Sequence, residues 1–181
     1  VPREVYTSRA VELPEGVNVE VEGLKVRVKG PRGVVERDFS FARSVSIRVE
    51  DGSVIVEAFF SKSRELALVG SIASHIKNMI VGVTRGFRYK LKVIYVHYPI
   101  SVRLDKGRLV ITNFLGERSV RYVEIPPGVK VTVSGQDIIV EGSDIELVGQ
   151  TAANIENTAR VKGRDRRKYV DGIYIYAREV M

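Results

Sequence analysis

One dense cluster of basic residues is the strongest chemical signal in this chain. The stretch from Arg160 to Gly172 reads RVKGRDRRKYVDG, and six of the nine residues from Arg160 to Lys168 are basic. Like charges repel and each prefers water, so a folded domain gains nothing internally from gathering these cations. Phosphate would neutralise them, because a guanidinium forms paired hydrogen bonds with phosphate oxygens. The candidate nucleic-acid-binding residues are these cations and the adjoining aromatic residue: Arg160, Lys162, Arg164, Arg166, Arg167, Lys168 and Tyr169.

The basic surplus lies almost entirely in the second half of the chain. The net charge is +7, and residues 1–82 contain 12 Lys and Arg against 11 Asp and Glu. Residues 83–181 contain 17 against 11, which favours a polyanionic partner for this half. Two other interpretations stay open: a solvated charged loop, which most charge runs are, and a protein-interaction scaffold whose loop grips an acidic protein partner.

A second basic stretch occurs in TRGFRYKLK, where no acid interrupts Arg85, Arg88, Lys90 and Lys92. Strand alternation predicts that the last three side chains share one face of a strand. That face is either a solvated sheet surface or a secondary phosphate contact, and the sequence favours neither.

The sequence contains little that could support catalysis. The chain has no cysteine, and neither His75 nor His97 has a nearby Ser, Asp or second His at the spacing of a triad or metal site. No phosphate-binding glycine loop is present. We therefore predict no enzyme activity, no metal, no cofactor and no small-molecule substrate, with His97 as a structural residue. The rival hypothesis, a hydrolase or transferase site near His97 and Tyr98, would require a cleft with perturbed carboxylates.

Hydrophobic periodicity predicts the elements that carry these residues. Alternating apolar residues predict β-hairpins over residues 17–28 and 45–56, the second with an Asp51-Gly52 turn. The spacing becomes helical at Ser63, which can cap a helix that ends at Gly82. No apolar run approaches the roughly 20 residues that span a bilayer, and no signal-peptide pattern is present, so we expect no membrane and a cytoplasmic protein.

The second half repeats this plan. The apolar pattern of residues 19–33 recurs at 102–116, VIVE at 54–57 recurs as IIVE at 138–141, and LVG at 68–70 recurs at 147–149. Ser143 and Glu146 predict a capping box for the second helix. The last strand, at 173–176, is expected to correspond to the strand after the first helix. The pattern predicts an α+β fold of two tandem duplicated domains, 1–82 and 83–181, each an antiparallel β-sheet with one main helix packed on a face.

Three segments carry a resemblance to a known family. They are LPEGVNVEVEGLKVRVKGPRG at 13–33, MIVGVTRGFRYKLKVIYVHYPI at 79–100 and QTAANIENTARVKGRDRRKYVDGIYI at 150–175. Together with the internal duplication they cover nearly the whole chain. On these segments the chain resembles the large-subunit ribosomal protein L6 family, in its archaeal and eukaryotic form.

The resemblance implies a structural constituent of the large ribosomal subunit, without catalysis or cofactor, at the ribosome in the cytoplasm. It implies that the second domain binds large-subunit (23S-type) ribosomal RNA near the translation-factor-binding region, beside neighbouring large-subunit ribosomal proteins. The first half is nearly neutral, and it faces solvent, protein neighbours or a translation factor; these alternatives stay open. Repulsion among the loop cations predicts a loop that is not ordered without RNA. The RNA-contacting positions that the resemblance carries over are Lys162, Arg164, Arg166, Arg167, Lys168 and Tyr169.

Overall fold

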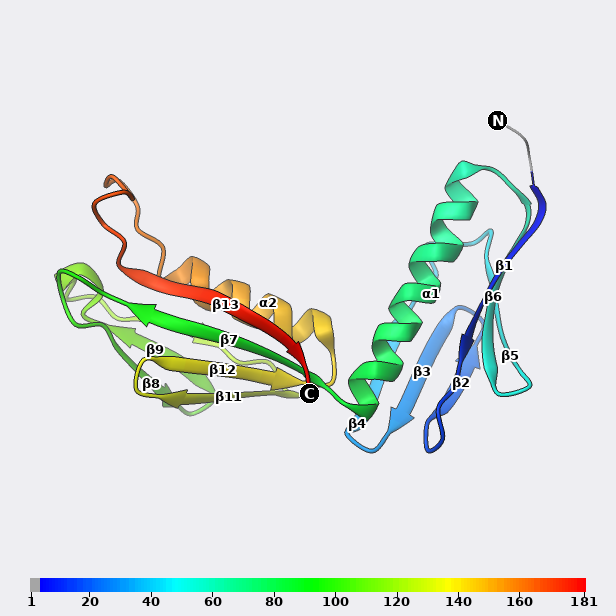
Figure 1. Ribbon diagram of the computed structural model, residues 1–181, viewed down its shortest axis with the longest axis horizontal. Coiled ribbons are helices and arrows are strands. Elements are labelled where there is room, and N and C mark those ends of the chain that lie inside the picture. The colour runs from blue at the N-terminus through cyan, green and yellow to red at the C-terminus, as the bar shows by residue number, and fades with distance from the viewer. Residues whose placement is uncertain (1–3) are drawn as a thin grey trace. The chain divides into compact units, whose positions relative to one another are not determined.

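The computed structural model describes residues 4–181, apart from the side chains of Glu4, Val5, Phe60 and Ser61. The chain divides into two compact units, residues 1–85 and 86–181 (Figure 1). The division expected from sequence, between residues 82 and 83, falls inside the last turn of the first helix. Each unit is described below by itself.

The first unit contains two antiparallel three-stranded sheets and one helix. The sheets have the strand orders β1-β6-β5 and β2-β3-β4. The helix, α1, packs against β1 and β6 of one sheet and β3 and β4 of the other. The elements are β1 (Glu4–Glu12), β2 (Asn18–Glu22), β3 (Lys25–Gly30), β4 (Gly33–Asp38), β5 (Ser46–Glu50), β6 (Ser53–Ser61) and α1 (Ser63–Thr84).

Both predicted hairpins are present in this unit. β2 pairs with β3 from Asn18↔Lys29 to Glu22↔Lys25, and β5 pairs with β6 across the Asp51-Gly52 turn. Asp51 and Gly52 have φ values of 46° and 74°, the left-handed conformations that a two-residue hairpin turn needs. The alternating residues Val26, Val28, Val54 and Val56 are fully buried in the core. The sequence predicted one antiparallel sheet in each domain, whereas the strands of each unit form two separate antiparallel sheets.

Helix α1 extends beyond the predicted end at Gly82. Its last turn continues through Thr84, whose hydroxyl donates a hydrogen bond to the Ile80 carbonyl at 2.8 Å. The chain turns instead at Gly86, which has a φ of 85°. A glycine does follow the end of the helix, as expected, but it is Gly86, whereas Gly82 is buried within the last turns of the helix.

Helix α1 also corrects the expectation that no segment reaches membrane-spanning length. By length and composition alone this 22-residue helix, which contains an 18-residue window with a mean hydropathy of 1.5, could cross a membrane. Its apolar side chains are instead the core of the first unit, where Val69, Ile72, Ile76 and Val83 are completely buried. The composition of this helix therefore reflects burial between two sheets.

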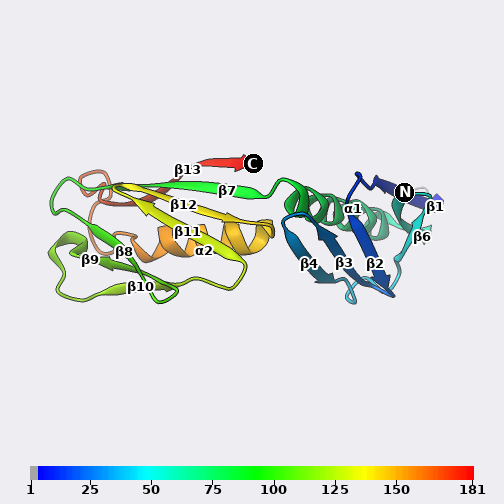
Figure 2. The ribbon, with the colours of Figure 1, turned by 90° about the horizontal axis from the view of Figure 1, so that it is seen from below.

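The second unit repeats this arrangement and adds one strand. Its sheets have the orders β10-β9-β8 and β11-β12-β7-β13, and α2 packs against β7, β12 and β13 on one side and β10 on the other (Figure 2). The elements are β7 (Phe87–Ile94), β8 (Ser101–Asp105), β9 (Arg108–Thr112), the 3-10 turn η1 (Phe114–Gly116), β10 (Arg121–Glu124), β11 (Val129–Ser134), β12 (Asp137–Gly142), α2 (Ile145–Thr158) and β13 (Gly172–Val180).

Two details of the predicted repeat are wrong. The strand after α1, β7, belongs to the second unit, where it takes the place that β1 has in the first. β13 is therefore an additional strand, which pairs with β7 from Gly172↔Ile94 to Val180↔Phe87. The N-cap of α2 is Asp144 rather than Ser143, because the Asp144 carboxylate accepts the Glu146 N–H at 2.9 Å.

Candidate nucleic-acid interface

The predicted basic stretch forms the connection between α2 and β13 at one end of the second unit. In Figure 1 it is the orange-to-red loop from residue 159 to residue 171, which we call the basic loop. Its two ends are fixed in the core: Val161 is 6% exposed and Asp171 is fully buried, whereas residues 162–168 are exposed. The cations thus project from a loop with buried ends.

Asp171 is the main anchor of the basic loop. One carboxylate oxygen accepts the backbone N–H groups of Val96 and His97 at 2.9 and 3.0 Å, and the other lies 2.7 Å from Nδ1 of His97. Burial of the carboxylate opposes its charge, but the hydrogen bonds from the His97 ring and the two amides prevail and lower the pKa of Asp171 to about 2. Asp171 therefore ties the end of the loop to the segment that follows β7.

A stack of three side chains supports the exposed part of the loop. The rings of His97 and Tyr169 are stacked with centroids 4.5 Å apart, and the Arg164 guanidinium lies 4.8 Å from the Tyr169 centroid. Such a cation–π contact orients the guanidinium while leaving its N–H groups available. The partly buried Tyr169 ring thus contacts both His97 and Arg164. Contact between Tyr169 and RNA stays a prediction.

A tight turn at Asp165 organises the tip of the loop. The Asp165 carbonyl accepts the N–H groups of Lys168 and Tyr169, and its carboxylate accepts the backbone N–H and the guanidinium of Arg167. The hydrogen bonds from Arg167 lower the pKa of Asp165. The sequence predicted that repulsion leaves this loop without order in the absence of RNA. That stays a prediction, and this turn, the ring stack and the buried ends are contacts that oppose the repulsion.

Most of the loop cations have no acidic partner. Arg167 pairs with Asp165 at 3.1 Å, and its side chain is still 91% exposed. Across the described residues, no ion pair is formed by Arg160, Lys162, Arg164, Arg166 or Lys168. The structure thus brings the predicted cations together on one exposed surface with their charge largely uncompensated.

The second basic stretch has a different character. Arg88, Lys90 and Lys92 share one face of β7 as predicted, but each meets a carboxylate on a neighbouring strand. The distances are 2.6 Å from Arg88 to Glu141, 2.8 Å from Lys90 to Glu179 and 3.0 Å from Lys92 to Asp137. Arg85 lies at the C-cap of α1, in the first unit. A phosphate at β7 would have to displace these carboxylates, so the face is better explained as cross-strand pairing within the sheet.

We therefore expect the β7 cations to contribute little to RNA binding. Replacing Arg88, Lys90 and Lys92 together by Ala should leave the affinity for large-subunit ribosomal RNA within about threefold, since each of these cations is already paired with a carboxylate and is not available to phosphate. Filter binding of the full-length chain at several salt concentrations measures this. A loss of affinity as large as that caused by removing the loop cations would show that the β7 face also binds RNA.

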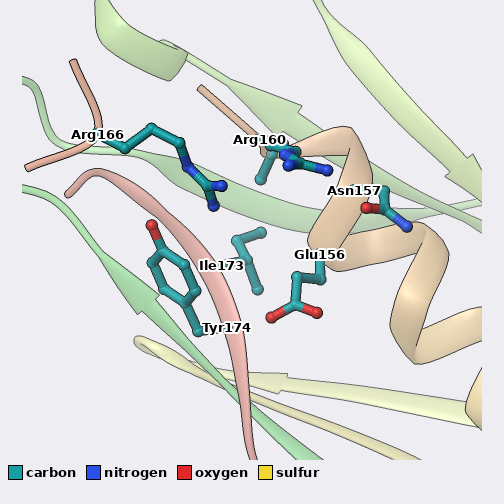
Figure 3. A pocket seen from close by; sticks show the side chains of 7 residues that line it. Glu156, Asn157, Arg160, Arg166, Ile173 and Tyr174 are labelled. Atoms are coloured by element: carbon teal, nitrogen blue, oxygen red, sulfur yellow. The ribbon is translucent and has the colours of Figure 1, made fainter. Parts of the chain in front are cut away.

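The surface beside the root of the basic loop is hollowed in two places. A cavity of about 280 Å³ is lined by Glu156, Asn157, Arg160, Arg166, Ile173 and Tyr174 (Figure 3). A second, more open depression of about 420 Å³ has Arg121, Asn157 and Lys162 in its wall. Within residues 4–181, no three His, Asp or Glu side chains are grouped so that they could hold a metal ion.

Sequence reasoning missed the residues that hold the loop in place. The sequence predicts no role for Asp171, which lies near the end of the basic stretch, and predicts His97 only as a structural residue. They lie 74 positions apart and are brought together only when β13 pairs with β7. The single local signal was an acid directly before a strand, which is too common to indicate a buried anchor.

The fold and the site together define a class: a duplicated α+β protein with a basic surface loop and no catalytic constellation among its described residues. Comparison with known proteins then identifies the family. The ribosomal protein L6 model matches the chain twice, at residues 13–86 and 98–171, and the chain belongs to this family. Each match covers most of one unit, as a duplicated domain requires.

Relatives of known identity match along almost their entire length. The large ribosomal subunit protein uL6 of Aeropyrum pernix is 59% identical over 179 residues, which are 99% of this chain and 98% of the relative. That of Desulfurococcus amylolyticus is 58% identical over 176 residues, 96% of each chain. That of Methanothrix thermoacetophila is 46% identical over 167 residues, 92% of this chain and 94% of the relative.

Proposed function

We propose that this protein is a structural constituent of the large ribosomal subunit and binds large-subunit ribosomal RNA through the basic loop. Family membership supports the ribosomal role, because the relatives carry the name of a large-subunit protein. It also supports a structural rather than an enzymatic protein and the ribosome in the cytoplasm as its location. Large-subunit ribosomal RNA and neighbouring ribosomal proteins are then its partners.

The observation that carries the RNA interface is the set of exposed cations without acidic partners on a loop with anchored ends. Guanidinium groups held in this way can pair with phosphate oxygens, and with 2′-hydroxyls, at little cost in conformational entropy. Gly163, with a φ of 70°, allows the bend that directs the neighbouring cations outward. The protein would recognise the shape of an RNA backbone more than its base sequence.

The resemblance also suggests that the bound RNA lies near the region where translation factors act. We retain this location as part of the proposal. The first unit, which has almost no net charge, would then face solvent, a neighbouring protein or a translation factor.

The salt dependence of RNA binding tests the proposal. If about five phosphates are neutralised, a plot of log affinity against log salt for the full-length chain and large-subunit ribosomal RNA should have a slope of roughly −4. A slope near zero would contradict a phosphate-binding interface. If tight binding in a cell extract survived ribonuclease treatment, the alternative of an acidic protein partner would be favoured instead.

A further inference from the structure

The cavity at the root of the basic loop combines cationic, acidic and apolar walls. Arg160 follows the end of α2 and Arg166 comes from the loop, and both are among the side chains that line the cavity (Figure 3). Both side chains are exposed, and neither forms an ion pair with an acid in the described part of the chain. The cavity wall therefore offers two guanidiniums without an acidic partner, the groups that pair with phosphate oxygens.

Glu156, an acid, also lines the cavity (Figure 3). One of its oxygens accepts the Ile175 N–H at 3.2 Å. A carboxylate offers about four acceptor positions, so most of its capacity remains open. A phosphate would be repelled at this point, whereas a hydrogen-bond donor on the edge of a base would be attracted. The acid therefore indicates contact with a base rather than with the RNA backbone.

The remaining wall suits a flat aromatic ligand. The Tyr174 ring is held in place because its hydroxyl donates to the Val170 carbonyl at 3.0 Å, and Ile173, which is only 1% exposed, closes the bottom of the cavity. At roughly 30 Å³ per water molecule, the cavity of about 280 Å³ holds about nine waters, which is enough for one base with part of its sugar. A drug-sized ligand usually occupies a larger pocket.

Among the four bases, guanine alone presents two adjacent donors, N1–H and N2–H, on its Watson–Crick edge. These match the two oxygens of a carboxylate, whereas adenine, cytosine and uracil each present an acceptor beside their donor. We propose that this cavity receives one unpaired guanosine nucleotide of the bound RNA, with the base edge on Glu156 and the phosphate between Arg160 and Arg166. This inference rests on the proposed RNA-binding function.

Titration of the isotope-labelled full-length protein with nucleotides tests the inference by amide chemical shifts. Guanosine 5′-monophosphate should shift amides of residues 156–160 and 173–175 and bind about tenfold more tightly than adenosine or cytidine 5′-monophosphate, since a paired contact to a base edge discriminates by about this factor. Inosine 5′-monophosphate, which lacks the amino group, should bind with intermediate affinity.

Two variants separate the roles of the residues. Glu156→Gln keeps an acceptor for the Ile175 N–H, so the fold should be retained, and it should abolish the preference for guanosine. Arg160→Ala should weaken all nucleotides alike, because it removes a phosphate contact and leaves the base edge untouched. If Glu156→Gln kept the full preference, Glu156 would serve only to bind Ile175 and the inference would be overturned.

The remaining outcomes are also decisive. If all the nucleotides bind with equal affinity, the cavity is an anion site only and base recognition is rejected. The same conclusion follows if inorganic phosphate produces the same amide shifts as guanosine 5′-monophosphate. The salt slope for ribosomal RNA is measured on the same samples. If the salt slope is roughly −4 but guanosine is not preferred, this inference alone is rejected. If guanosine is preferred but ribosomal RNA does not bind, the nucleotide site is supported and the proposed function is rejected.

Discussion

Removing Arg164, Arg166, Arg167 and Lys168 together should lower the affinity for large-subunit ribosomal RNA by about 100-fold or more at roughly 0.1 M salt. Three of these cations have no acid to neutralise them, and Arg167 keeps most of its surface exposed. Each phosphate contact releases about one counterion from the RNA on binding, so each lost contact means that about one counterion fewer is released. The slope of log affinity against log salt should therefore become shallower by roughly 3. Filter binding of the full-length Ala variant across a salt series measures both quantities.

The matched control removes the same number and kind of charges elsewhere. Arg43, Arg64, Lys77 and Arg118 are exposed and lie outside the basic loop. Their replacement by Ala lowers the net charge equally and should leave the slope close to that of the unmodified chain. Equal losses in the two variants would mean that only total charge matters, and the loop would then be an ordinary solvated charge run.

Replacing Asp171 by Ala should destabilise the second unit by about 3 kcal/mol, because three partly buried donors lose their acceptor, at about 1 kcal/mol each. The donors are the N–H groups of Val96 and His97, with Nδ1 of His97 also losing its partner. The stack of His97, Tyr169 and Arg164 should loosen as well. We expect RNA affinity to fall by about tenfold even where the variant is folded, since part of the binding energy must then order the loop.

Denaturant unfolding and RNA binding of the same variant distinguish these effects. Asp105→Ala is the control, since Asp105 is an exposed acid at the end of β8 in the same unit. It should change the free energy of unfolding by less than about 0.5 kcal/mol. An Asp171→Ala protein as stable as this control would contradict the role of Asp171 as an anchor.

The charge of Asp171 should also give the second unit a specific sensitivity to acid. Its pKa falls from the usual 3.8 to about 2 on folding, so the folded state favours the charged form. The resulting stabilisation, up to about 2 kcal/mol, is complete above pH 3.8 and is lost as the pH falls from about 4 to about 2. Asp171→Asn should lack this component in acid unfolding curves, and an unchanged curve would refute the assignment.

Much of the fold followed from local patterns. Alternating valines predicted the β2–β3 and β5–β6 hairpins, and helical spacing predicted α1 and α2, because these periods reflect which side chains a strand or a helix buries. The less accurate predictions concerned ends and partners. Gly82 rather than Gly86 was taken as the helix end, and β13 was matched to β7, because a strand pattern does not specify which strand it will pair with.

By itself, the sequence determined the duplicated α+β plan, the family resemblance and the positions of the cations in residues 160–168, all of which depend on residue type and spacing along the chain. Only the tertiary structure decided which cations keep an uncompensated charge. Arg88, Lys90 and Lys92 resemble the loop cations in sequence, yet strand pairing places a carboxylate beside each of them. Residues 160–168 contain Asp165 as their single acid, and the contact between Asp171 and His97, 74 positions apart, holds the end of the loop. Ion pairing depends on distances of a few ångströms, and those distances exist only once the strands are paired.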